Sequence, residues 1–170
     1  MARIGRKGRL WLRAFHIFFM GLWVGAIISE LVIFASTGSA RSDGGLQAMY
    51  QIGDILVPVF GACASGTIIT GLLLSWLTPW GFFKHKWVIY TIAVTVLYLL
   101  VQFALIEPLG SKLAALVEAG GLRALQNPEY INTWNRFIIL GMVNALLFIS
   151  MAFVSVIKPW HKREGAEATL

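Results

Sequence analysis

Four long apolar segments limit the folds open to this chain more than any other feature of its sequence. They cover residues 10–35, 52–77, 87–106 and 137–157. Each has about 20 residues or more, the length that an α-helix needs to cross a hydrocarbon layer about 30 Å thick. A membrane β-barrel would instead show alternating segments of about 10 residues. The sequence therefore predicts an all-α membrane protein, a single domain over residues 1–170 built as an antiparallel bundle of four transmembrane helices.

The composition agrees with a membrane location. Hydrophobic residues make up 58% of the chain and charged residues 13%, against about 45–50% and about 25% in soluble proteins. A soluble domain of 170 residues has too little interior to hide so much apolar surface. This excludes a soluble nucleic-acid-binding module, although the net charge is +6. The first segment is longer than a signal-peptide core of about 7–15 residues, so we expect it to remain as a helix.

Lysine and arginine are distributed unevenly between the two ends of the predicted bundle. One end carries Arg3, Arg6, Lys7, Arg9, Arg13, Lys84, Lys86, Lys158, Lys162 and Arg163, and the other carries Arg41, Lys112, Arg123 and Arg136. Because basic residues gather on the cytoplasmic side of membranes, we predict that both termini lie in the cytoplasm. The short loops and compact bundle suit a bacterial inner membrane.

The polar connections between the segments differ in length. Residues 36–51 form a short polar connection with a turn at Gly44-Gly45. In the longest connection, leucine and valine recur at helical spacing over residues 109–117, before Gly120-Gly121. We predict a short amphipathic helix there, lying on the outer surface, with a plain linker as the alternative. Asn127-Pro128 then turns the chain into the last span.

Small residues indicate where helices approach each other closely. The first span contains Gly21-x-x-x-Gly25, and the second has a run of small residues from Gly61 to Gly66, followed by Gly71. Close backbone contact supplies much of the packing energy between helices in lipid. We therefore expect the second span to be central, and a homodimer through Gly21 and Gly25 is a further arrangement that the sequence allows.

His16 is the first candidate for a functional role. Met20, Trp23, Ile27 and Glu30 follow it on the same face of the first span. Polar residues at membrane depth are costly, so a functional site is the default hypothesis. A neutral imidazole can ligate haem iron. The alternative is a histidine that only hydrogen-bonds to a neighbouring helix.

A basic group at the start of the third span lies on the same side of the membrane as His16. It comprises Lys84, His85 and Lys86. Lys86 or His85 would lie opposite His16 across a cofactor between spans one and three, although an amine ligates a metal only when burial deprotonates it. Arg13 and Lys84 would neutralise haem propionates. The alternative is that Lys86 extends to the lipid headgroups.

Acidic residues form a second candidate group. Glu30, Asp54 and Glu107 lie near the outer ends of the first three spans. Three carboxylates at one depth would coordinate a cation or share a proton. The alternative is that they pair with Arg41 and Arg136, which lie at the same level.

Further polar residues lie inside the third and fourth spans. Thr91, Thr95, Tyr98 and Gln102 share one face of the third, and Asn144 is in the middle of the fourth. They would line a polar path or form hydrogen bonds between helices, and we expect hydrogen bonds. The chain has no Cys-x-x-Cys, Walker or nucleophile-elbow motif, which excludes c-type haem and thiolate metal sites.

Three short motifs carry a resemblance to a known superfamily. They are Arg13-Ala14-Phe15-His16 with Gly21-Leu22-Trp23-Val24-Gly25, then Thr70-Gly71-Leu72-Leu73, and His85-Lys86-Trp87. This arrangement resembles a superfamily of small membrane proteins that includes the HemJ-type protoporphyrinogen oxidases, the CopD-type copper-resistance membrane domains and an uncharacterised family of four-span integral membrane proteins. In the HemJ type, a histidine of span one and a lysine of span three are associated with bound haem b. The resemblance implies His16 and Lys86 as the matching residues here.

Two functional hypotheses follow from these residues. The first is a membrane protein that binds haem b or a related porphyrin near the cytoplasmic face and has a redox role, such as porphyrinogen oxidation. His16 would be the axial ligand, and Lys86 a second ligand or a propionate partner. The alternative is a small cofactor-free transporter, channel or accessory subunit that uses Glu30, Asp54, Glu107 and Asn144.

Overall fold

The computed structural model describes residues 4–160, and within that range it is helical, with no β-strand. The helices are α1 (Arg6–Ser36), α2 (Asp43–Leu77), α3 (Lys86–Val101), α4 (Glu107–Gly120) and α5 (Pro128–Ile157), joined by the short segments η1 (Thr37–Ser39), η2 (Gln102–Ile106) and η3 (Gly121–Gln126). Four helical stretches are long and apolar enough to cross a membrane. The predicted all-α bundle of four spans is confirmed at this level.

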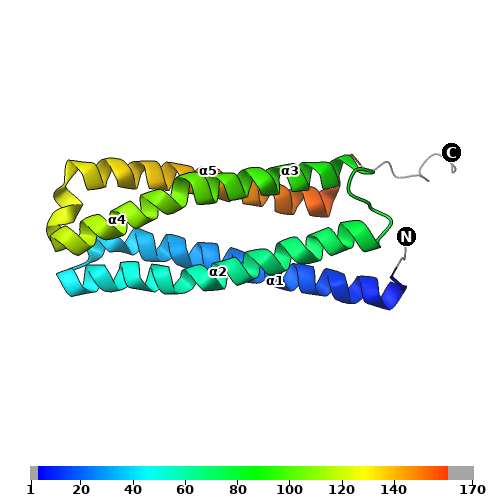
Figure 1. The fold of residues 1–170 in the computed structure, drawn as a ribbon, viewed down its shortest axis with the longest axis horizontal. Coiled ribbons are helices and arrows are strands. Elements are labelled where there is room, and N and C mark those ends of the chain that lie inside the picture. Colours follow the sequence, from blue (N-terminus) through cyan, green and yellow to red (C-terminus); the bar gives the residue numbers. More distant parts are fainter. Residues whose placement is uncertain (1–3, 161–170) are drawn as a thin grey trace, which may run out of the picture.

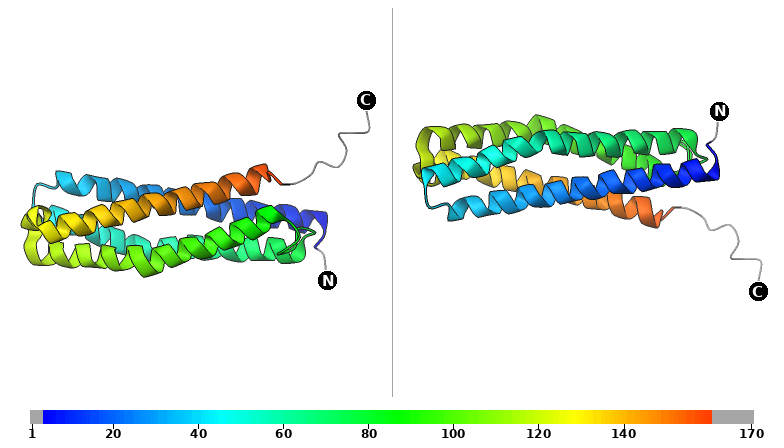
Figure 2. Two further views of the ribbon diagram at one scale, coloured as in Figure 1. Left: turned by 90° about the horizontal axis from the view of Figure 1, so that it is seen from above. Right: turned by 90° about the horizontal axis from the view of Figure 1, so that it is seen from below.

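The helices form two antiparallel pairs that lie side by side (Figures 1 and 2). One pair is α1 with α2, and the other is α5 with the α3–α4 stretch. α1 begins, and α5 ends, at the same end of the bundle, which we call the terminal end; α4 and η3 lie at the opposite end, the α4 end. The two pairs approach closely where α2 meets α4 and η3. Nearer the terminal end they meet through large side chains.

α2 begins earlier than the sequence pattern predicted. Residues 43–51 were expected in a polar connection with a turn at Gly44-Gly45, but they are the first turns of α2. Ser42 caps the helix, because its hydroxyl oxygen accepts the backbone N–H of Gly45 at 3.1 Å. Asp43 in the first turn also suits the positive end of the helix dipole. The apolar pattern marks the lipid-facing part of α2, and the capping residues mark its start.

α4 is helical, as expected for residues 109–117, but it is not a separate helix. It continues α3 through η2, a π-helical turn in which the Glu107 N–H donates to the Gln102 carbonyl. Pro108 in the first turn of α4 has no N–H, and its ring would crowd the carbonyl four residues earlier. The wider π turn accommodates this proline without breaking the rod. α4 ends at Gly120, and Gly121 has a positive φ of 55°.

Glycines of α2 make room for aromatic rings of α1. A Cβ placed on Gly66 would lie 2.5 Å from Cδ1 of Phe19, and one on Gly71 would lie 3.2 Å from Cε1 of His16. Gly61, in contrast, would meet nothing within 4 Å. The expected close packing of α2 is therefore confirmed at Gly66 and Gly71. At these two positions, side-chain rings of α1 lie directly against the backbone of α2.

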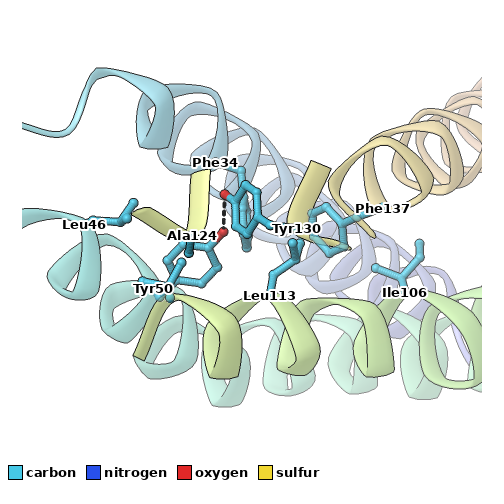
Figure 3. Packing of buried hydrophobic residues seen from close by; sticks show 9 residues of the cluster. Phe34, Leu46, Tyr50, Ile106, Leu113, Ala124, Tyr130 and Phe137 are labelled. Carbon is cyan, nitrogen blue, oxygen red and sulfur yellow. Dashed lines mark hydrogen bonds between the residues drawn. The ribbon is translucent and has the colours of Figure 1, made fainter. Parts of the chain in front are cut away.

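Two clusters of buried side chains fill the bundle. The α4-end cluster consists of Phe34, Leu46, Tyr50, Ile106, Leu113, Val117, Ala124, Tyr130 and Phe137 (Figure 3). Within it the Tyr50 and Tyr130 hydroxyls form a buried hydrogen bond of 2.8 Å. The central cluster consists of Trp23, Cys63, Tyr98 and Phe148. Each cluster takes residues from all four spans, so these two clusters hold the pairs together.

Candidate functional site

His16 lies on the inner side of α1 and is half-buried against α2. Its Nδ1 is 3.0 Å from the Thr67 carbonyl oxygen and 2.9 Å from the Thr70 hydroxyl oxygen. Gly71 provides the space that the ring occupies. The sequence could not identify these partners, because they depend on how α1 is aligned along α2.

The hydrogen bonds determine which nitrogen of His16 carries the proton. A carbonyl oxygen can only accept, and the Thr70 hydroxyl already donates to the Gly66 carbonyl at 2.7 Å. We therefore assign Nδ1 as the donor, and a neutral ring then has a bare lone pair on Nε2. No residue within 4–160 forms a hydrogen bond with Nε2. His16 is thus oriented as a ligand histidine is, with one nitrogen fixed and the other free to bind.

Cations and tryptophans close the terminal end of the bundle. The Arg13 guanidinium lies 4.5 Å from the Trp80 ring centroid, and the Lys158 ammonium lies 4.8 Å from the same centroid. Trp80 meets Trp87 edge-on at 5.3 Å. Partial burial, together with the nearby charge of Arg13, lowers the pKa of Lys158. This arrangement links α1, the α2–α3 loop, α3 and the end of α5.

The other residues predicted for a cofactor site lie at the same end of the bundle, but none of them takes part in the hydrogen bonds of His16 to Thr67 and Thr70. Lys86 is the first residue of α3, and its side chain is exposed. His85 is the N-cap residue of α3, and its ring stacks on Trp87 with centroids 6.3 Å apart. The guanidinium of Arg13 lies over the Trp80 ring. A direct pairing of His16 with Lys86 or His85 is absent from the described contacts.

The structure separates the three predicted acidic residues. Asp54 and Glu107 are exposed, whereas Glu30 is partly buried on the inner face of α1. Among residues 4–160, no group of three His, Cys, Asp or Glu side chains lies close enough to hold a metal ion. Arg136 is also exposed and lines a shallow surface pocket of about 410 Å³ beside the Lys112–Glu129 ion pair. Within residues 4–160, these three carboxylates therefore do not form a group that could hold a metal ion.

Polar side chains of α3 and α5 form hydrogen bonds between the helices, as expected. Tyr90 donates to Ser150 at 3.0 Å, and Thr95 donates to the Met151 sulfur at 3.1 Å. The Asn144 amide nitrogen donates to Oε1 of Gln102 at 3.0 Å. The Asn144 amide oxygen is buried and has no hydrogen-bond partner in the described part of the chain.

One contact that the sequence did not suggest fixes the α4 end. The Asp43 carboxylate accepts the backbone N–H of Leu122 at 2.7 Å, and Gly121, at positive φ, lies directly against it. The sequence could not predict this contact, because Asp43 and the Gly120-Gly121 segment are far apart in the chain and neither forms a distinctive motif.

Comparisons of the chain with protein-family models, with curated proteins and with solved structures found no match.

Proposed function

We propose that this protein binds b-type haem or a related porphyrin in the membrane, with Nε2 of His16 as the axial ligand. The observation that carries the proposal is the hydrogen bond of 3.0 Å from Nδ1 of His16 to the Thr67 carbonyl. Metal-ligating histidines almost always donate their second nitrogen to a carbonyl or carboxylate, which fixes the ring and raises its basicity. Such a cofactor supplies one-electron chemistry, and the protein's part is to hold and orient it.

The basic residues of the terminal end suit the charged edge of such a cofactor. Haem carries two propionate groups, and Arg13 is on the same side of α1 as His16, one turn away. Lys86 is exposed at the start of α3 and is free of described ion pairs. We propose Arg13 and Lys86 as propionate partners, with His85 next to them, rather than Lys86 as a second ligand.

The cofactor proposal is tested by the absorption spectrum of the purified protein, oxidised and then reduced with dithionite. We expect a sharp band between about 400 and 430 nm after haem is supplied. His16→Ala removes the proposed axial nitrogen, so the band should be lost. Asp54→Ala, at an exposed position of α2 outside the proposed cofactor site, is the control and should keep the band.

Two outcomes would contradict the cofactor proposal. A wild-type protein that remains colourless after haem is added does not bind haem. A band of the same position and intensity in His16→Ala would exclude His16 as the ligand. Recovery of the band when imidazole is added to His16→Gly would provide direct support, because the free ligand replaces the missing side chain.

We also propose the membrane orientation that the charges favour. The terminal end carries most of the lysine and arginine residues, so it would face the cytoplasm of a bacterial cell, with both termini inside. Cysteines introduced at exposed positions, one at each end, test the orientation by their reaction with an impermeant thiol reagent in intact cells.

A homodimer is proposed for the open face of α1. Gly21 and Gly25 are exposed, and a Cβ on either would meet nothing within 4 Å. Because small residues let backbones approach in lipid, Gly25→Leu should shift a dimer to the monomer in light-scattering measurements in detergent. A wild-type protein that is monomeric throughout would contradict this arrangement.

A further inference from the structure

A polar layer lies between the two buried clusters. Along α5, Asn144 is one turn from Phe148 of the central cluster and two turns from Phe137 of the α4-end cluster. Along the α3 rod, Gln102 lies between Tyr98 of the central cluster and Ile106 of the α4-end cluster. Gln102 also begins the π turn, a local helix widening that is frequent at functional sites. The bundle interior thus changes from apolar to polar and back to apolar within a few turns.

The side-chain amides of Asn144 and Gln102 cannot provide partners for all of their own hydrogen-bonding groups. Asn144 is 3% exposed, and its single hydrogen bond goes to Gln102. Whichever way the two amides face, one polar atom of Asn144 remains without a partner in residues 4–160. A buried polar atom without a partner costs about 1–3 kcal/mol. The Asn144 amide in this layer can therefore bind one further polar group.

Glu30 brings a carboxyl group to the same region. It lies on the inner face of α1, two turns from Trp23 of the central cluster. It is also one turn from Phe34 of the α4-end cluster, so along α1 it lies between the two clusters, as Gln102 and Asn144 do on their own helices. The Trp23 ring meets the Tyr98 ring edge-on at 5.2 Å, so α1 and α3 are in contact here.

The apolar parts of the four spans contain no lysine or arginine that could neutralise Glu30. Residues 14–35, 55–77, 87–106 and 137–157 contain no lysine or arginine, and Glu30 is their only acidic residue. Asp54 on α2 is exposed, α5 has no charged residue between Arg136 and Lys158, and the titratable side chains of residues 87–106 are Tyr90 and Tyr98. A carboxylate in a bundle interior is very costly unless a cation or a proton neutralises it.

We propose that Glu30, Tyr98, Gln102 and Asn144 form a binding site for one monovalent cation, either a proton or Na⁺. Each of these side chains has at least one oxygen atom, and hard cations prefer oxygen ligands. A proton on Glu30 would turn the carboxyl into a donor for a neighbouring amide oxygen. In both cases one positive charge balances Glu30, and the site is separate from the proposed cofactor site at His16.

The test measures the thermal stability of the detergent-solubilised full chain by intrinsic fluorescence. Tm is followed in NaCl and in choline chloride at equal ionic strength, over a range of pH. A cation that binds only the folded state raises Tm in a saturable way. Glu30→Gln is the test variant, because it keeps the shape and removes the charge. Asp54→Asn is the matched control, because it removes an exposed carboxylate.

The two cations give different results. If Na⁺ occupies the site, NaCl raises Tm by a few degrees over choline chloride in wild type and Asp54→Asn, and this rise is lost in Glu30→Gln. If a proton occupies the site, Tm rises as pH falls in both salts, because a neutral carboxyl costs less to bury, and this rise is also lost in Glu30→Gln.

The proposal also assigns a role to Asn144. Asn144→Leu removes the unpartnered amide without adding charge, so the protein should fold and the Na⁺ midpoint should move to higher concentration. The proposal is overturned if Glu30→Gln responds to Na⁺ and pH as wild type does. It is also overturned if wild type responds to neither cation.

Discussion

Replacing Gly66 with leucine should destabilise the protein by about 3 kcal/mol, near the upper end of the usual cost of overpacking. A single methyl group at this position would already lie 2.5 Å from the Phe19 ring. Leucine adds three further carbon atoms, so α1 and α2 would have to move apart. That movement would also weaken the contact between His16 and Thr70, one turn further along α2. The measurement is the midpoint of thermal unfolding in detergent.

Gly61→Leu is the matched control for this prediction. It lies on the same helix, but a side chain there meets nothing within 4 Å, so we expect a change within about 0.5 kcal/mol. Phe19→Ala should relieve most of the loss in Gly66→Leu, which a double-mutant cycle would detect as coupling. Equal stability of Gly66→Leu and Gly61→Leu would show that α1 and α2 pack in another register.

Trp23→Ala should cost about 3–5 kcal/mol, as large-to-small changes of buried aromatic residues do. Trp23 is 5% exposed and packs edge-on against Tyr98 at 5.2 Å and Phe148 at 5.0 Å. These contacts join α1 to α3 and α5, where the two helix pairs otherwise have few close approaches. Because the helices are surrounded by lipid, the stability lost in Trp23→Ala comes from lost van der Waals packing and not from exposing apolar surface to water. The expected result is a lower and broader unfolding transition.

Trp11→Ala is the control for Trp23→Ala. Trp11 is on the same helix but is 67% exposed, so its removal should change stability by less than about 0.5 kcal/mol. If the two variants unfold alike, the central cluster does not hold the helix pairs together.

Hydropathy predicted the lipid-facing part of each helix well, and the full helices poorly. The predicted limits of the second and fourth spans at residues 77 and 157 agree with the ends of α2 and α5. Their starts were placed nine residues too late, because Asp43–Gln51 and Pro128–Arg136 are polar helical turns. Ser42 and Asn127 were the available signals, since each caps its helix through a side-chain oxygen.

Side-chain partners could be predicted only when they lie on one helix. His16, Trp23 and Glu30 were placed on one face from their spacing, and all three do face inward. The pairing of His16 with Thr67, or of Asn144 with Gln102, depends on how two helices slide along each other. Spacing within one span carries no information about that alignment. For the same reason the three acidic residues were grouped by depth, although two of them face outward.

The length of the helices determines where this protein meets water. α2 has 35 residues and is therefore about 52 Å long, whereas the hydrocarbon layer is about 30 Å thick. The excess falls at the α4 end, where Glu107, Lys112, Glu118 and Arg123 are all exposed. α2, the α3–α4 stretch and α5 are thus long enough to extend beyond such a layer at the α4 end as a short stalk with its own buried cluster, whereas α1 is apolar up to Ala35. In this stalk, unlike in the bilayer, exclusion of water drives the packing, so detergents and salts should act on the two parts of one rod differently.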